Sequence, residues 1–292
     1  MTDKHALIQP DKGQPATPIQ LIEKSGLDAL VKSLSGPQRA ALAAQKFEAE
    51  GYSYAIIPDG ESWFVVAGVA NTESLSSWCM AKLAEVLPAG TYRRTGGDPG
   101  PALFGWVSGQ YRFDRYRSEP GSEGPRILLT TQVKAIDPAL AEAAAVALVR
   151  DLVNTPAEDM GPAQLEAQAA ALAKTFKAEL KVTSGDALER EFPMVHAVGR
   201  AAARSHSPRM IELTWGDPKH PRIALVGKGV CFDSGGLDIK PAAGMMWMKK
   251  DMGGAVFEHL NCEVRTRQSF RDRCNGLGPV LPGCRKWCLV SY

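Results

Sequence analysis

Residues 222–226 (Arg-Ile-Ala-Leu-Val) form a short apolar run that passes without a break into a glycine-rich loop. A strand that is apolar on both faces is typical of the centre of a parallel sheet covered by helices. Ligands of such sheets bind beyond the carboxyl ends of the strands, where residues 227–241 lie. The run therefore predicts an α/β fold with a ligand site in the loop that follows it.

Short apolar strands alternate with helical patterns in the first half of the chain, which is the order expected of an α/β domain. Strands are predicted at 54–58, 62–68 and 126–130, and helices at 73–87 and 103–111. Residues 1–20 mix Pro, Gly, Lys and Gln and are predicted to be a loose leader. We therefore expect a small N-terminal α/β domain over residues 21–132.

An alanine-rich helix is predicted to connect this domain to a second one. Asp137-Pro138 is a helix-start signal, because Asp caps helices and Pro is tolerated in the first turn. The pattern ends at 154–156, so the connecting helix is assigned to 133–156. Further helices are predicted at 161–177 and 192–203, and strands at 179–183 and 209–215. Residues 157–256 are expected to form the first part of an α/β domain with a mainly parallel central sheet.

Composition and charge exclude two classes of protein. No apolar run approaches the ~20 residues that span a bilayer, so no membrane segment is predicted and a cytoplasmic location is the default. The net charge is +2, but residues 257–292 hold six Lys or Arg and three acids, so the basic excess lies there. A nucleic-acid surface is therefore not inferred. Four of the six cysteines also lie in 257–292, in spacings that do not give a paired zinc pattern.

The loop after residue 226 holds the residues best suited to chemistry. It reads Gly227-Lys-Gly-Val-Cys-Phe-Asp-Ser-Gly-Gly-Leu-Asp-Ile-Lys-Pro241, and Met248-Lys-Lys-Asp-Met-Gly-Gly-Ala255 follows it. Glycines allow the backbone to approach a ligand closely. Aspartates supply the hard oxygen donors that divalent metals prefer. The pattern therefore favours a metal site.

Two other interpretations of this loop fail. A phosphate-binding P-loop needs Ser or Thr after Lys228 and a glycine six positions before it, but the chain has Gly229 and Arg222 there. A serine protease is suggested by residues 233–236, Asp-Ser-Gly-Gly, but Phe232 stands where that family has Gly. None of the five histidines lies in the Ala-His-Cys setting of that family.

The third interpretation depends on a family resemblance. Residues 228–255 resemble the leucine (cytosol) aminopeptidase family of two-metal exopeptidases, with Lys, Asp, Lys and Asp at offsets 0, 5, 12 and 23. The stretch 150–157, Arg-Asp-Leu-Val-Asn-Thr-Pro-Ala, is also similar to the family. The resemblance implies that residues 157–256 are part of an aminopeptidase catalytic domain.

The resemblance also implies roles for individual residues. Lys228, Asp233 and Asp251 resemble metal ligands, with Asp233 as the carboxylate that bridges two metals. Asp251 would lie near the free amino group of the substrate. Lys240 resembles the catalytic lysine that polarises the scissile carbonyl and stabilises the oxyanion. Met248 resembles part of the apolar pocket for the first side chain.

Cofactors and partners follow from the same resemblance. The family uses two divalent ions, Mn²⁺ or Zn²⁺, and cleaves peptides that have a free N-terminus, with a preference for leucine-type residues. Its members form homo-hexamers. The neighbouring Lys249 and Lys250 are interpreted as solvent-facing, and Cys231, Ser234 and Asp238 as structural.

The chain departs from the family pattern after Ala255. The second family signature, Asn-Thr-Asp-Ala-Glu-Gly-Arg, which completes both metal sites, does not occur in the 292 residues. Residues 257–292 contain no Ala and are predicted to be a tail foreign to the family, after a truncated catalytic domain. Two hypotheses follow. One is a leucyl aminopeptidase whose activity is impaired by the missing signature; the other is an inactive fragment or pseudoenzyme. In either case at most one weak metal site is expected.

Overall fold

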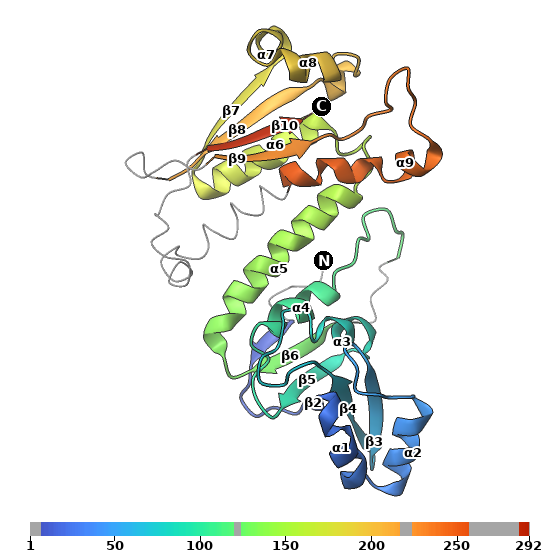
Figure 1. The fold of residues 1–292 in the computed structure, drawn as a ribbon. Coiled ribbons are helices and arrows are strands. Elements are labelled where there is room, and N and C mark those ends of the chain that lie inside the picture. Colours follow the sequence, from blue (N-terminus) through green and yellow to red (C-terminus); the bar gives the residue numbers. More distant parts are fainter. Residues whose placement is uncertain (1–6, 120–123, 217–223, 257–285, 292) are drawn as a thin grey trace. The chain divides into compact units, whose positions relative to one another are not determined.

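The structure is a computed structural model that describes residues 7–119, 124–216 and 224–256 and the backbone of 286–291 (Figure 1). The chain falls into two compact units, Met1–Ala144 and Ala145–Tyr292. The boundary between them lies within one long helix, α5 (Val133–Asn154). The helix that the sequence predicts as a connector therefore contributes residues to both units.

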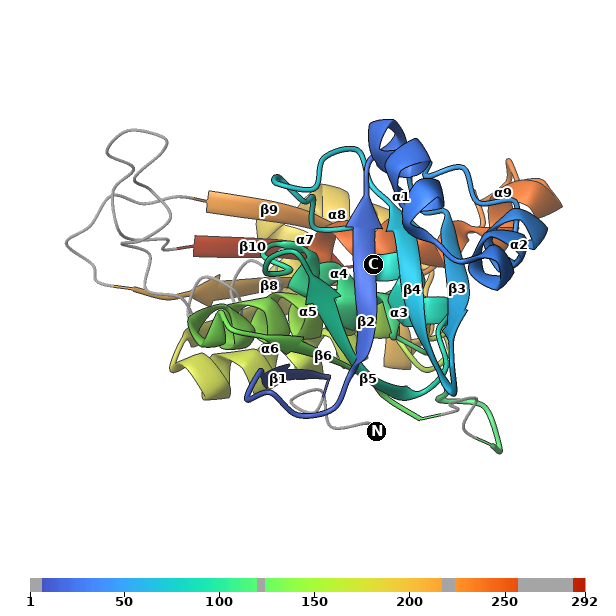
Figure 2. The same cartoon turned by 90° about the horizontal axis from the view of Figure 1, so that it is seen from below.

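A six-stranded sheet forms the centre of the first unit (Figure 2). Its strands are β1 (Ile8–Pro10), β2 (Thr17–Ile22), β3 (Tyr54–Asp59), β4 (Ser62–Gly68), β5 (Gly90–Thr95) and β6 (Arg126–Thr130). Their order is β1-β6-β5-β2-β4-β3, and every pair is parallel except the antiparallel β3–β4 hairpin. The predicted α/β class is confirmed, and this sheet is mainly parallel.

Short helices lie between these strands. They are η2 (Lys24–Gly26), α1 (Leu27–Ser33), α2 (Gly36–Ala44), α3 (Ala81–Val86) and α4 (Ala102–Gly109). Helix α4 is apolar apart from Ser108, and its residues 102–108 are buried, as expected of a helix in the core. The indole of Trp106 on α4 is fully buried, and its N–H donates to the Arg126 carbonyl at 2.9 Å. This bond satisfies the indole N–H, which would otherwise be a buried donor without an acceptor.

The loose leader predicted for residues 1–20 is wrong from residue 8 onward; residues 1–6 lie outside the described part. Strand β2 pairs with β4 on one side and β5 on the other, and Ile19 is fully buried. The proline at position 18 obscured this strand, because proline is rare in a central strand. Tertiary burial of the apolar residues outweighs the lost donor.

The helix predicted at 73–87 is shorter than expected, since α3 covers only Ala81–Val86. Side chains satisfy the backbone before it: the Asn71 amide oxygen accepts from the N–H groups of Glu73 and Ser74. Such local bonds offer the chain an alternative to a helix. The helix predicted at 103–111 is present as α4, and the strands at 54–58, 62–68 and 126–130 are present as β3, β4 and β6.

Helix α5 begins at Val133, the first residue assigned to the connecting helix, so the start signal at Asp137-Pro138 lies inside it. A proline near the start of a helix removes a single backbone bond, and here the helix continues past it. The predicted end is correct, because α5 stops at Asn154. The Thr155 hydroxyl and N–H both donate to the Asp151 carbonyl, at 2.7 and 3.0 Å.

The second unit contains a four-stranded sheet in the order β7-β8-β10-β9. Its elements are α6 (Pro162–Phe176), β7 (Glu179–Ser184), α7 (Gly185–Glu191), α8 (Pro193–Gly199), η3 (Arg204–His206), β8 (Arg209–Thr214), β9 (Ala224–Gly229), α9 (Ala242–Met246), η4 (Met248–Met252) and β10 (Lys286–Ser291). Strand β10 runs antiparallel to β8 and parallel to β9, and β7 runs antiparallel to β8. Only one of these three pairings is parallel, in contrast to the first sheet.

Two predictions for this unit change in detail. The helix expected at 192–203 is the shorter α8, preceded by a separate helix α7. The strand expected at 222–226 is β9, whose described part starts at Ala224; residues 222 and 223 lie outside the description. Its predicted central position is wrong for the described sheet, because β9 is last in the order β7-β8-β10-β9 and Val226 is 68% exposed. Residues 286–291 of the predicted tail form β10, while 257–285 and 292 are outside the described residues.

The core of the second unit is built from small and medium apolar side chains of α5, α6, β8 and η4. Its buried members are Leu152, Met160, Leu165, Ala169, Ala173, Ile211, Leu213, Cys231, Met252, Ala255 and Val256. Helix α6 packs on β7 and β8. The core therefore fixes both the end of β9 and the η4 segment, between which the candidate site lies.

Across the described residues, none of the helices has the length and apolar character needed to cross a bilayer.

Candidate metal site

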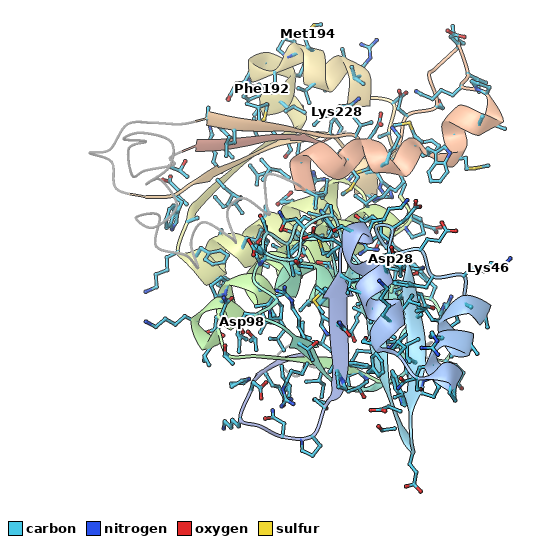
Figure 3. All side chains as sticks on the ribbon, turned by 60° about the horizontal axis from the view of Figure 1, so that its bottom comes forward. Asp28, Lys46, Asp98, Phe192, Met194 and Lys228 are labelled. Atoms are coloured by element: carbon cyan, nitrogen blue, oxygen red, sulfur yellow. The ribbon has the colours of Figure 1, made fainter. Side chains whose placement is uncertain are left out.

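Strand β9 and the segment after η4 are in backbone contact, and this contact brings Lys228 beside Asp251. A Cβ atom added to Gly227 would lie 2.6 Å from the Ala255 Cα, and one on Gly254 would lie 3.1 Å from the Lys228 nitrogen. Only glycine allows two backbones to approach so closely. The Lys228 Nζ lies 3.3 Å from the Asp251 Oδ2. Lys228 is labelled in Figure 3.

The loop between β9 and α9 folds back on itself and brings Lys240 to Asp233. The Asp233 Oδ1 accepts from the Gly235 N–H at 2.9 Å, and the Lys240 N–H donates to the Ser234 carbonyl at 2.9 Å. Gly235 has φ +91°, and a Cβ there would lie 2.2 Å from the Asp238 carbonyl oxygen, so this turn requires glycine. The Lys240 ammonium consequently donates a hydrogen bond to the Asp233 carboxylate.

Lysines hold both carboxylates in the charged form. The hydrogen bond from Lys240, with that of the Gly235 N–H and the nearby charge of Lys228, lowers the pKa of Asp233 below its ordinary value. The hydrogen bond from Lys250 is the main cause of the lowered pKa of Asp251, and Lys228 adds to it. An opposite charge close to a carboxyl group favours its ionised form. The site thus presents two carboxylates that already bind cationic groups.

The structure brings together four of the five residues that the sequence singled out. Lys228 acts on both carboxylates, and Lys240 and Asp251 complete the cluster. Met248, predicted to line a substrate pocket, is only 5% exposed and so is packed in the interior in this structure. The exposed apolar residues nearby are Met246 and Trp247.

Lys249 was predicted to face solvent, and that prediction is wrong. Its ammonium donates to the Leu152 carbonyl at 2.7 Å, and burial lowers its pKa to about 8. A lysine so far from its partner in the chain gives no local sequence signal. Lys250, in contrast, is exposed as predicted and donates to the Asp251 Oδ1 at 3.0 Å. Cys231 is buried, in agreement with a structural role.

The donors that could hold a metal are an amine and two carboxylates. Across the described ranges, no three His, Cys, Asp or Glu side chains gather closely enough to bind an ion. The candidate set therefore depends on Lys228 together with Asp233 and Asp251. Carboxylates suit hard divalent ions, and a neutral amine is a further donor.

Comparisons with known proteins agree with these features. A model described as "Cytosol aminopeptidase family, catalytic domain" matches residues 147–269, and one described as "M17 aminopeptidase, N-terminal domain" matches residues 17–128. The catalytic match extends 13 residues past the limit of 256 predicted from the sequence. The N-terminal match begins inside the predicted leader, as the strand β2 does.

Curated relatives cover part of the chain. The probable cytosol aminopeptidase of Rhodococcus jostii is 36% identical over 175 residues, which are 54% of this chain and 34% of the relative. That of Sinorhizobium medicae is 32% identical over 223 residues, 70% of this chain and 43% of the relative. The chain thus spans between a third and a half of the length of these relatives.

Solved structures share the fold. The cytosol aminopeptidase from Coxiella burnetii has a TM-score of 0.80 and 33% identity, covering 98% of this chain and 60% of that one. The bottromycin maturation enzyme BotP in complex with Mn has a TM-score of 0.71 and 28% identity, covering 98% of this chain and 59% of that one. The two family matches together take in most of the chain, and they include every candidate site residue. This chain therefore belongs to the cytosol aminopeptidase family.

Proposed function

We propose that this chain carries part of the active site of a metal-dependent aminopeptidase, which releases leucine-type residues from the N-terminus of peptides. The observation that carries the proposal is the cluster of two lysine–aspartate pairs, Lys228–Asp251 and Lys240–Asp233. Family membership supports the reaction class. A cytoplasmic location and assembly into a homo-hexamer are proposed on the same ground.

The donor set fits a divalent ion. Asp233 and Asp251 are both held ionised by ammonium groups, so the surroundings already favour a positive charge at each carboxylate. Lys228 lies within reach of Asp251, and its side chain is 60% exposed. These three residues would hold one ion, Mn²⁺ or Zn²⁺. A second ion would share Asp233 and need ligands beyond this set.

A bound ion supplies Lewis acidity and lowers the pKa of a bound water toward neutrality. The chain's own residues would orient the substrate. Asp251 would accept a hydrogen bond from the free amino group of the peptide, which limits cleavage to the first residue. Lys240 keeps its proton and donates to the carbonyl oxygen where negative charge develops. In this structure its ammonium is bound to Asp233, so a cation at Asp233 would release it for that role.

A second function rests on the same geometry. The carboxylates are already paired with lysines, so the loop could bind a cation weakly without catalysing hydrolysis. Such a protein would be a pseudoenzyme with a partial metal-binding loop. The two functions differ in one measurable respect. Only the aminopeptidase hydrolyses peptides, and that hydrolysis requires Lys240.

Metal uptake and peptide hydrolysis measured together test the proposal. After loading with Mn²⁺ or Zn²⁺ and desalting, elemental analysis is expected to find metal in the unaltered chain and little in Asp233→Asn or Asp251→Asn. Lys240→Ala should retain metal but lose about 10²–10³ in the hydrolysis of leucine p-nitroanilide. Lys82→Ala, which removes an exposed ion pair with Glu85, is the control and should change neither.

The outcomes separate the two functions. Hydrolysis that depends on Lys240 supports the aminopeptidase. Metal uptake that needs both aspartates, without hydrolysis, supports the pseudoenzyme. Metal uptake that neither aspartate variant reduces would contradict both.

A further inference from the structure

Lys249 occupies an unusual place beside the candidate site. It lies in η4 between Met248 and Lys250, two residues before Asp251. Its neighbour Lys250 is a surface residue with a 65% exposed side chain. Lys249 instead turns inward and donates to the Leu152 carbonyl at 2.7 Å. Burying a lysine amine disfavours its charged form, so a compensating contact is needed to retain it there.

The Leu152 carbonyl needs this donor. It is one of the last four carbonyls of α5, which have no partner within the helix. The next N–H that could reach it belongs to position 156, which is Pro156 and has no N–H. The carboxyl end of a helix also carries a partial negative charge that attracts cations. Lys249 therefore caps the C-terminus of α5.

The contacts on the other side of Asp251 lead to the same helix end. Met252 is fully buried in the core cluster that includes Leu152. A Cβ on Gly253 would lie 3.7 Å from a methyl group of Val153, so the segment runs along the end of α5. Asp251 is thus held between two residues that are both anchored to α5.

We propose that Lys249 is a positioning residue, which fixes the η4 backbone to the end of α5 and thereby sets the place of the Asp251 carboxylate. It contacts neither substrate nor metal. The inference rests on the proposed function, because it assigns Asp251 to metal binding. Removing the Lys249 donor leaves η4 held by apolar packing of Met248 and Met252 without its hydrogen bond to α5, and the Asp251 carboxylate then samples more positions.

The variants Lys249→Met and Lys250→Met provide a matched test. Both keep an unbranched side chain and remove one positive charge, one residue apart. Residues that orient a metal ligand typically contribute 10–100-fold to affinity, so Lys249→Met should weaken the binding of Mn²⁺ or Zn²⁺ by about tenfold. Lys250→Met should leave the affinity equal or tighter, because it removes a cation that competes for Asp251. Lys249→Arg, which keeps a donor, should recover part of the loss.

Leu188→Ala is the control for a merely structural effect. Leu188 is fully buried in α7, away from η4, and its truncation should destabilise the same unit. Calorimetric titration of the folded variants with Zn²⁺ is the measurement. Equal affinities of Lys249→Met and the unaltered chain would overturn the inference and leave the proposed function standing. An equal loss in Leu188→Ala would also overturn it. Absence of metal binding by the unaltered chain would overturn the proposed function together with the inference.

Discussion

The two units use charged and apolar residues in different ways. In the first unit, Arg93 binds Asp11 and the Gln14 carbonyl and so holds a loop to the sheet. Large aromatic side chains fill its core, and the ring of Tyr92 lies 5.6 Å from that of Trp106. In the second unit, the core is made of smaller side chains, and charged residues gather on β9, the loop that follows it and η4.

The contacts of the first unit stabilise a fold, whereas the charged contacts of the second unit arrange a site. Burial of Tyr92 raises its pKa to about 12, and its hydroxyl donates to the Pro88 carbonyl at 2.6 Å. The hydroxyl is therefore satisfied within the fold and contributes to its stability. The carboxylates of Asp233 and Asp251 are partly exposed, and hydrogen bonds from lysines lower the pKa of both. We therefore expect substitutions in the first unit to change stability and those near β9 to change metal binding.

Trp106→Ala should have the largest effect. Loss of a fully buried aromatic side chain typically costs about 3–5 kcal/mol of unfolding free energy. It also leaves the Arg126 carbonyl without the indole donor. Denaturant unfolding followed by circular dichroism measures the change. Zn²⁺ uptake by the variant, in conditions where it remains folded, should match that of the unaltered chain; a parallel loss of metal would contradict the separation of roles.

Two glycine substitutions, each of which would create a close backbone clash, sharpen the comparison. A Cβ at Gly105 in the first unit would lie 2.1 Å from the Ser77 carbonyl oxygen, and one at Gly227 would lie 2.6 Å from the Ala255 Cα. Overpacking of this kind commonly costs about 1–3 kcal/mol, so both Gly105→Ala and Gly227→Ala should be destabilising. Only Gly227→Ala should also reduce Zn²⁺ affinity, because it separates Lys228 from Asp251. Equal affinities for the two variants would show that the close approach does not arrange the site.

The acid stability of the first unit provides a smaller test. The hydrogen bond from Arg93 is the main cause of the lowered pKa of Asp11 in the folded chain. The unfolded chain therefore binds more protons, and the stabilisation is present above the ordinary pKa near 3.8 and is lost as pH falls through the folded value. Asp11→Asn should flatten the decline in stability below pH ~4. Arg93→Met should have the same effect; a decline unchanged in either variant would contradict this assignment.

Sequence analysis found some site residues and missed another. They differ in how far along the chain each residue lies from its contact partner. Lys228, Asp233, Lys240 and Asp251 lie within 24 residues, so a local motif that resembles a known family could identify them. Lys249 was missed because its partner Leu152 lies 97 positions away. No local pattern encodes such a contact.

The same reason explains the errors in the fold. Strand β2 contains proline and depends on pairing with β4 and β5, which follow much later in the chain. Strand β10 pairs with β8 and β9, but its composition resembles no family pattern. Helix α4 was predictable because its apolar character is local. Local periodicity thus predicted helices and hairpins, whereas long-range pairing did not appear in the sequence.

Proton release on metal binding tests the metal site most directly. An ammonium cannot ligate a metal, so Lys228 must lose its proton when an ion binds, and the proton must appear in solution. Titration calorimetry with Zn²⁺ near pH 7, in buffers of different ionisation enthalpy, counts that proton. We predict that the unaltered chain releases about one proton more per ion than Lys228→Met, whose residual binding depends on Asp233 and Asp251, because ionisation of a metal-bound water adds to both. Equal proton release by the two proteins, or none by either, would contradict ligation by Lys228.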